Sequence, residues 1–188
     1  MARPKSDDKR DAIMAAAIRV IAAQGLSAPT AVIAREAGVS NGSLFTYFAT
    51  KADLLNQLYM ELKAEMAAAA LDGVPAEGDV REQMRHVWTH WLRWATSYPD
   101  KRRTLAHLGV SDDITEASGE AGHRTMAGIA SLLARSRENG PMADAPMGFV
   151  VALMNSLAEA TIDFMIQDPA NADKHCKASF DAAWRMLV

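Results

Sequence analysis

PTAVIAREAGVSNGSLFTYFATKADLL, residues 29–55, is the most informative segment of this 188-residue chain. Gly38 interrupts two short runs of helix-compatible residues, and glycine readily adopts the left-handed conformation that ends a helix. Ser40 can cap the second run by accepting a backbone N–H, and Thr50 can cap a longer helix that follows. The segment therefore predicts two short helices joined by a tight turn, and then a long helix.

Helix signals continue on both sides of this segment. Upstream, Ser6 with Asp7 and Asp8 is typical of a helix start, and an apolar stripe with helical spacing then runs to Gly25. Downstream, DGVPAEGD is typical of a connector, and Ser111 is expected to cap a helix. Apolar periodicity and stop signals predict downstream helices over about 50–71, 80–97, 101–108, 111–137, 145–167 and 172–187. The predicted fold is all-α, with about nine helices.

The composition restricts the class of protein. Apolar residues make up 49% and charged residues 23% of the chain, which is typical of globular proteins and argues against a disordered chain. Cys176 is the only cysteine, so no intrachain disulfide can form and a reducing compartment is favoured. The charged N-terminus is unlike a signal peptide, and the apolar run Phe149 to Met154 stops at Asn155. We expect a cytoplasmic protein without a membrane span.

The net charge of −3 is unevenly distributed along the chain. Residues 1–51 contain seven Lys or Arg and four Asp or Glu, whereas residues 52–188 contain 13 and 19. A basic N-terminal part on an acidic remainder favours contact between the N-terminus and a polyanion, although many soluble proteins have a similar imbalance.

The segment 29–55 resembles the DNA-binding region of the TetR family of transcriptional regulators. The resemblance rests on Ile-Ala in the first short helix, Ala-Gly-Val-Ser at the turn, Gly-Ser-Leu-Phe in the second short helix, and then an aromatic pair, a Lys and a Leu pair. The matching residues are Ile33, Ala34, Ala37, Gly38, Val39, Ser40, Gly42, Ser43, Leu44, Phe45, Tyr47, Phe48, Lys51, Leu54 and Leu55. Together with the preceding helix, the match covers about residues 10–60. Two positions depart from the family pattern: Phe45 replaces a common Tyr, and Asn41 replaces a common Lys or Arg.

The residue types in this helix-turn-helix divide into buried and exposed groups. The apolar ones are expected to form the core of the domain: Ile33, Ala34, Val39, Leu44 and Phe48. Polar residues and one glycine remain on the outer face of the recognition helix, where amides and hydroxyls can read base edges. The candidates for base contact are Asn41, Gly42, Ser43 and Thr46, and the alternative for each is an ordinary solvated surface.

Further contacts with the DNA backbone are implied by the resemblance. The positions that match phosphate-binding positions of the family are Thr30, Tyr47, Thr50 and Lys51. Arg3, Lys5 and Arg10 are candidates for additional phosphate contacts from an N-terminal arm, or for solvated charges.

The resemblance also implies a division of the chain and a mode of action. Residues 1–50 would form the DNA-binding domain and residues 51–188 a helical ligand-binding and dimerisation domain, connected by the helix at about 50–71. The protein would bind a palindromic operator as a homodimer, act as a repressor and be released by a small-molecule effector. Candidate pocket residues are Trp88, Trp91, Trp94, His107, Met126, Met154 and Asn155, for which core packing is the alternative. Candidate dimer contacts are Leu157, Phe164, Phe180 and Trp184.

Two groups of residues have spacings that resemble metal sites. His86 and His90 have the spacing of a helical metal pair, but the HExxH glutamate is absent, and the acids Asp112, Asp113 and Glu116 fit a helix N-terminus. We expect no enzyme, metal or cofactor. The alternatives are a ligand-independent architectural DNA-binding protein and a small all-α metal-dependent hydrolase.

Overall fold

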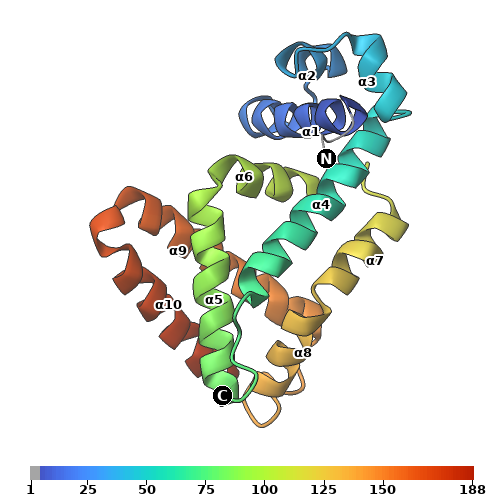
Figure 1. The fold of residues 1–188 in the computed structure, drawn as a ribbon. Coiled ribbons are helices and arrows are strands. Elements are labelled where there is room, and N and C mark those ends of the chain that lie inside the picture. The colour runs from blue at the N-terminus through green and yellow to red at the C-terminus, as the bar shows by residue number, and fades with distance from the viewer. Residues whose placement is uncertain (1–4) are drawn as a thin grey trace. The chain divides into compact units, whose positions relative to one another are not determined.

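The computed structural model describes residues 5–188, with Lys5 and Ser6 described by their backbone alone. Every regular element in this range is helical, which confirms the all-α prediction. The elements shown in Figure 1 are α1 Lys5–Gln24, α2 Thr30–Glu36, α3 Asn41–Tyr47, α4 Lys51–Leu71, α5 Val80–Ser97, α6 Pro99–Leu108, α7 Glu116–Thr125, α8 Ala127–Ser136, α9 Met147–Gln167, the 3₁₀ turn η1 Pro169–Asn171, and α10 Ala172–Leu187.

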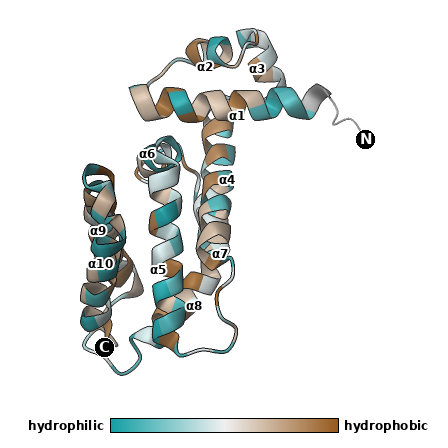
Figure 2. Cartoon of the chain, turned by 60° about the vertical axis from the view of Figure 1, so that its left-hand side comes forward, coloured by the Kyte–Doolittle hydropathy of each residue, from teal (hydrophilic) through white to brown (hydrophobic). Residues whose placement is uncertain are grey.

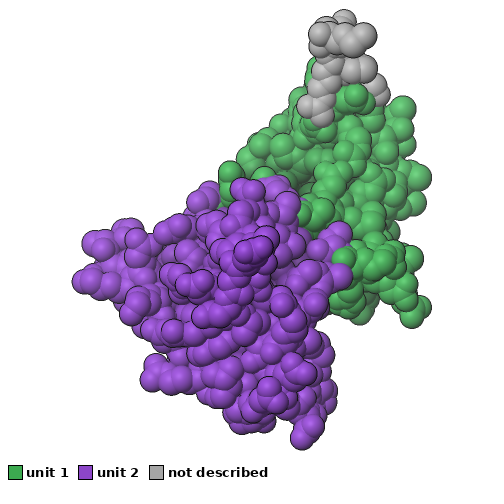
Figure 3. All heavy atoms as spheres, turned by 60° about the horizontal axis from the view of Figure 1, so that its bottom comes forward, with its two compact units in different colours: residues 1–64, 98–124 green, residues 65–97, 125–188 purple. Residues whose placement is uncertain are grey.

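The helices form two compact units, coloured separately in Figure 3. The first unit contains the chain up to Ala64 together with Tyr98–Arg124, and the second contains Glu65–Ser97 and Thr125–Val188. The functional division expected at residue 50 stays a prediction, because compactness alone does not assign functions to the parts.

The first unit is built around α1, against which α2, α3 and α6 pack. Ile13 and Ile21 on α1 are fully buried, as are Ile33 on α2 and Leu44 on α3. In Figure 1, α2 and α3 lie together along one side of α1. Thr104 on α6 donates a hydrogen bond of 3.0 Å to the backbone oxygen of Ile18. Two helices as short as α2 and α3 are unstable alone, so burial of their apolar faces against α1 holds them in place.

The helix starts differ from the sequence expectations at two places. α1 begins at Lys5, so Ser6 lies in its first turn and not at its cap. The helix expected over 111–137 is two helices, α7 and α8, with Met126 between them. The cap of α7 is Thr115, whose hydroxyl accepts the N–H of Ser118 at 3.2 Å, whereas Ser111 accepts only the N–H of Asp113 in the preceding turn.

A buried polar contact explains why α7 starts at Thr115. The amide of Asn56, on α4, donates 2.7 Å to the backbone oxygen of Asp113 and accepts the N–H of Thr115 at 2.9 Å. This long-range clasp satisfies backbone groups that would otherwise have continued a helix from Ser111. Local sequence patterns could not predict this contact, because Asn56 and Thr115 are 59 positions apart.

In the second unit α5, α9 and α10 pack against one another, and Figures 1 and 2 both show α9 and α10 side by side. α9 has the length and apolar composition to cross a membrane, but the core helix of a soluble protein passes the same test. Val150 and Ile162 of α9 are fully buried within the unit. Phe149 and Phe164, in contrast, are 52% and 59% exposed. α9 is therefore a packed helix that also carries exposed apolar residues.

Candidate nucleic-acid interface

The turn between α2 and α3 has the geometry expected from Gly38. The φ angle of Gly38 is +70°, in the left-handed region that favours glycine. Its N–H donates 3.1 Å to the oxygen of Arg35, and the N–H of Val39 donates 2.9 Å to the oxygen of Ala34. These two bonds form a Schellman motif, which satisfies the last carbonyl groups of α2 and turns the chain sharply toward α3.

The next residues start α3 and direct its first turn. Ser40 has an extended backbone, and its hydroxyl accepts the N–H of Ser43 at 3.1 Å, which confirms the predicted cap. Leu44 and Phe48 are fully buried beneath α3. The other face of this seven-residue helix is consequently the one left for solvent or a partner.

The four residues expected to contact bases all lie on α3, and they differ in how free their polar groups are. Asn41, Gly42 and Thr46 are exposed, and Ser43 is half-buried. The hydroxyl of Thr46 donates 3.3 Å to the backbone oxygen of Gly42, so its lone pairs remain available as acceptors. The Asn41 side chain makes no hydrogen bond within the described part of the chain and presents a full donor and acceptor pair.

The four residues expected to contact phosphates lie at ends of α2, α3 and α4. Thr30 is the first residue of α2, Tyr47 the last of α3 and Lys51 the first of α4. Thr50 precedes α4, and its hydroxyl accepts the N–H of Asp53 at 3.0 Å, as predicted for a cap. The Lys51 ammonium donates 2.5 Å to the backbone oxygen of Leu26. Thr30 and Tyr47 are half-buried and make no side-chain hydrogen bond within residues 5–188.

The additional basic candidates have different positions. Arg3 lies outside the described residues, and nothing is described of the Lys5 side chain. Arg10 is not a solvated arm residue: its guanidinium donates to Gln57 at 3.0 Å and to the Glu61 carboxylate. A predicted member of the core also differs, because Val39 is only half-buried. Its place in the turn between two short helices leaves part of its side chain uncovered.

Two comparisons with known proteins point to the same family. The sequence model of the bacterial regulatory proteins of the tetR family matches residues 13–58. A putative tetR family transcription regulator from Shewanella sp. PV-4 is 29% identical, covers 96% of this chain and 98% of its own, and superposes with a TM-score of 0.84. Residues 13–58 thus match the model of the TetR family, and the whole chain is similar to a TetR-family regulator. TetR-family regulators are DNA-binding transcription factors, so the helix-turn-helix of α2 and α3 is the nucleic-acid-binding element.

Other TetR-family structures share the whole fold. A transcription regulator from Marinobacter aquaeolei VT8 is 23% identical, covers 99% of this chain and 98% of its own, and gives a TM-score of 0.81. The TetR-like regulator LfrR from Mycobacterium smegmatis was solved in complex with proflavine and is 21% identical. It covers 96% of this chain and 98% of its own, with a TM-score of 0.69. The likeness therefore extends over the C-terminal helices, for which the sequence offered only helix number and length.

The residues expected to line an effector pocket differ widely in their burial. Trp88 and Trp94 are buried and have internal partners, since their indole N–H groups donate to Ser179 at 3.2 Å and Glu65 at 3.0 Å. Satisfied indoles of this kind are typical of core tryptophans. Trp91 is half-buried, with its ring 5.7 Å from that of Trp88. The remaining candidates are buried (Met154), half-buried at a helix junction (Met126) or exposed (His107 on α6 and Asn155 on α9).

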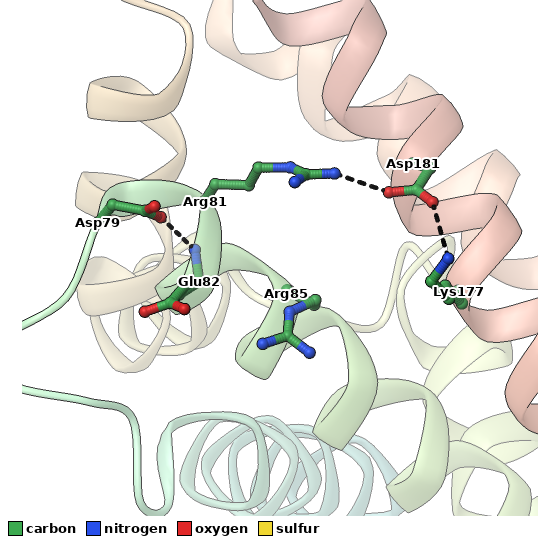
Figure 4. A pocket seen from close by; sticks show the side chains of 6 residues that line it. All are labelled: Asp79, Arg81, Glu82, Arg85, Lys177 and Asp181. Carbon is green, nitrogen blue, oxygen red and sulfur yellow. Dashed lines mark hydrogen bonds and ion pairs between the residues drawn. The ribbon is translucent and has the colours of Figure 1, made fainter.

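A depression of about 380 Å³ does occur within the second unit, and Figure 4 shows its lining. Its lining residues are all charged: Asp79, Arg81, Glu82, Arg85, Lys177 and Asp181. Arg81 and Lys177 share the carboxylate of Asp181, at 2.9 and 3.8 Å. None of these residues belongs to the expected pocket, and an entirely charged lining is unlike the largely apolar lining of small-molecule sites. It is best described as a solvated charged groove.

The residues expected at a dimer interface also have different positions. Phe164 is exposed and Leu157 half-buried on α9. Phe180 is only 2% exposed, and its ring stacks on the half-buried Trp184 with 6.1 Å between centroids. Phe180 therefore packs inside the protomer, whereas α9 carries several exposed large apolar side chains, namely Phe149, Val151, Phe164 and Ile166.

The residues with metal-like spacing lie in two places, with His86 and His90 on α5 and Asp112 and Asp113 before the start of α7. The rings of His86 and His90 lie 3.8 Å apart, and His86 Nε2 lies 2.7 Å from the backbone oxygen of Asp72. In the described part of the chain, no three His, Cys, Asp or Glu side chains gather as metal ligands would. Asp112 and Asp113 are exposed in the turn that precedes α7.

Burial shifts the pKa of three side chains outside the helix-turn-helix. It lowers the pKa of Lys63, whose ammonium lies 5.7 Å from the ring centroid of Tyr59. It raises the pKa of Tyr59, which packs so closely on Gly122 that an added Cβ would approach its ring to 2.8 Å. It also raises the pKa of the Cys176 thiol, which keeps this buried cysteine protonated and unreactive.

Proposed function

We propose that this chain is a transcriptional repressor that binds a palindromic operator as a homodimer and is released by a small-molecule effector. The observation that carries the DNA-reading part is the outer face of α3. It presents a free amide at Asn41 beside Gly42, whose absent side chain leaves open space.

Gly42 needs an explanation because glycine weakens a helix. In a helix, glycine costs up to about 1 kcal/mol relative to alanine. Apart from the adjoining residues and the backbone of α3 itself, no atom of the described chain lies within 4 Å of the position that a Cβ at residue 42 would occupy, and its φ is not positive. The fold therefore does not require a glycine there. Close approach of an external surface, such as the edges of bases in a major groove, does require one.

The exposed apolar part of α9 supports a homodimer. Phe149 and Phe164 are 52% and 59% exposed, and Ile166 is 47% exposed. Large exposed apolar side chains grouped on one helix favour burial against a partner. A second copy of the chain would also place two recognition helices on half-sites about 34–36 Å apart, which multiplies specificity. The interface residues proposed on this basis are Leu157 and Phe164, with Trp184 at the edge.

The effector part of the proposal is supported by the fold that this chain shares with LfrR, which was solved with proflavine. The apolar helical body could open a pocket beside Trp91 and Met126, where side chains are only partly buried. As a regulator of this kind, the protein would act in the cytoplasm and catalyse no reaction. Residues 1–50 would read DNA, and residues 51–188 would hold the effector and the second protomer.

Selection of genomic fragments bound by the purified protein tests the DNA-reading part. The expected result is one enriched palindrome, whose affinity falls steeply with salt because phosphate contacts release counterions. The matched control is Asn41→Ala with Thr46→Ala, which removes polar groups of α3 without touching the buried face. That variant should retain its fold and lose the enrichment. Broad binding by the wild type without a palindrome would instead support an architectural DNA-binding protein.

A thermal-shift screen tests the effector part. A ligand that binds the folded protein raises its Tm. By linkage, a ligand that weakens operator binding must itself bind more weakly to the operator complex, and by the same factor. Compounds that raise the Tm should therefore lower operator affinity. If all such compounds left operator affinity unchanged, release by an effector would be refuted.

A further inference from the structure

The recognition helix ends at a hydrogen-bonded chain of residues that come from three separate parts of the sequence. We propose that Arg10, Gln57 and Asp53 form a brace that fixes the C-terminal end of α3, and that Arg10 acts as a positioning residue and not as a phosphate contact. The inference rests on the proposed reading of DNA by α3.

The first link joins α1 to α4. Arg10 lies on α1, and one nitrogen of its guanidinium donates 3.0 Å to Oε1 of Gln57 and also binds the Glu61 carboxylate, both on α4. The side chain of Arg10 is one-third exposed and that of Glu61 one-half exposed. A charged donor held by two acceptors on a neighbouring helix is already well satisfied inside the protein.

The second link carries the connection to the turn after α3. The amide nitrogen of Gln57, Nε2, donates a hydrogen bond of 3.0 Å to Oδ1 of Asp53. The second carboxylate oxygen of Asp53 accepts the backbone N–H of Ala49 at 3.0 Å. An unbroken chain of hydrogen bonds therefore runs from α1, through two residues one turn apart on α4, to the backbone of Ala49.

A third contact joins Arg10 to Phe48, the residue before Ala49. The guanidinium carbon of Arg10 lies 5.7 Å from the ring centroid of Phe48, within the range of a cation–π contact. Phe48 is fully buried and caps the C-terminus of α3, with its N–H donating 3.0 Å to the oxygen of Leu44. Both branches of the brace thus end on the two residues that follow α3.

The position of the brace explains what it controls. α3 has seven residues, too few to hold an orientation by itself, so its direction depends on how its two ends are attached. The Schellman turn at Gly38 and the Ser40 cap fix the N-terminal end. The brace fixes the other end. Loosening it would let α3 tilt, and small misplacements reduce the fit to base edges more than they reduce phosphate contacts.

The test compares Arg10→Met and Gln57→Met for binding to the selected operator and to random DNA over a range of salt concentrations. Methionine at residue 10 keeps an apolar stem over Phe48, and the change at residue 57 breaks the chain without altering charge. Both variants should lose roughly tenfold in operator affinity, about the effect of one lost hydrogen bond, and less on random DNA. The slope of log K against log salt should stay at the wild-type value. Lys51→Met is the matched control for a lost phosphate contact, and its slope should fall by about 0.9.

Two outcomes would overturn the proposal. If the slope of Arg10→Met fell like that of Lys51→Met, Arg10 would be a phosphate contact. If both variants, folded at the assay temperature, kept the wild-type ratio of operator to random affinity, the contacts would serve stability alone. If Arg10→Met does not fold, the affinity ratio of Gln57→Met decides the proposal.

A measurement without DNA separates failure of the brace from failure of the proposed function. The Ala49 amide should exchange its hydrogen slowly in the wild type and faster in Gln57→Met, because Asp53 loses its support. Unchanged exchange would refute the brace even if an operator is found. A wild type that selects no operator would refute the proposed function, and the exchange result would still stand.

Discussion

The ammonium of Lys51 donates a hydrogen bond of 2.5 Å to the backbone oxygen of Leu26, which belongs to the loop between α1 and α2. One side chain at the start of α4 therefore holds the loop that leads into the helix-turn-helix. An ammonium has three N–H donors, so the same group can still bind a phosphate.

Lys51→Met is expected to weaken DNA binding and to reduce stability together. Loss of the ammonium should lower affinity for operator and random DNA by the same factor, as expected for a phosphate contact. The unsatisfied Leu26 carbonyl should lower the free energy of unfolding by about 1 kcal/mol. Binding titrations and urea unfolding measure the two effects. A loss restricted to operator DNA would contradict the phosphate role of Lys51.

Asn41→Ala should relax sequence preference at one base position of each half-site. The amide is exposed and free, and a bidentate contact with a base contributes about 1–3 kcal/mol of discrimination. Competition with operators that carry single substitutions measures the preference. Asn139→Ala, an exposed asparagine in a turn of the second unit, is the control and should leave it unchanged. Equal losses on operator and random DNA would refute base reading by Asn41.

Gly42→Ala should separate stability from DNA binding. An added Cβ meets no atom within 4 Å, so the variant should be as stable as the wild type or more stable by about 0.5 kcal/mol. Operator affinity should fall, because the methyl group would hold α3 away from the bases. Thermal unfolding and operator titration measure the two effects. Unchanged operator affinity would show that nothing approaches this position.

Gly38→Ala, unlike Gly42→Ala, should destabilise the protein. It is the control for the claim that the fold does not require a glycine at residue 42. Its φ of +70° costs a residue with a Cβ about 1–2 kcal/mol, although the surrounding space is open. The free energy of unfolding should fall by that amount. A variant as stable as the wild type would mean that the turn between α2 and α3 had changed its conformation.

Lys63→Met should stabilise the protein at neutral pH. Burial lowers the pKa of Lys63 below its ordinary 10.5, so the folded state binds this proton less tightly than the unfolded chain. Burial of the charged Lys63 lowers the free energy of unfolding by its full amount below the folded-state pKa. This effect disappears as the pH rises from that pKa to 10.5. The free energy of unfolding of the variant should exceed that of the wild type by about 0.5–1 kcal/mol at pH 7.

The pH dependence provides the check on Lys63. The gain should shrink as urea unfolding is repeated toward pH 10, and Tyr59, whose pKa is raised, should stay neutral over most of that range. The control is Lys177→Met, because the Lys177 side chain is 80% exposed and lies 3.8 Å from Asp181. A gain of equal size at every pH would contradict the assignment.

Much of the DNA-binding element was predictable because its signals are local. Gly38, Ser40 and Thr50 act on backbone groups within five residues of themselves, and the structure confirms each turn or cap. The same short range explains the error over residues 111–137. Ser111 is a good local cap, but the contact of Asn56 with Thr115 starts α7 later.

The sequence by itself determined the all-α fold, the helix-turn-helix and the face of α3 that stays exposed, since these follow from backbone preferences and helical spacing. Only the tertiary structure decided the fate of side chains whose partners are distant in the chain. Arg10 binds residues 47 and 51 positions away, and the indole of Trp88 donates to a hydroxyl 91 positions away. Which of several compatible partners a long side chain meets depends on how whole helices pack, and no local pattern encodes that.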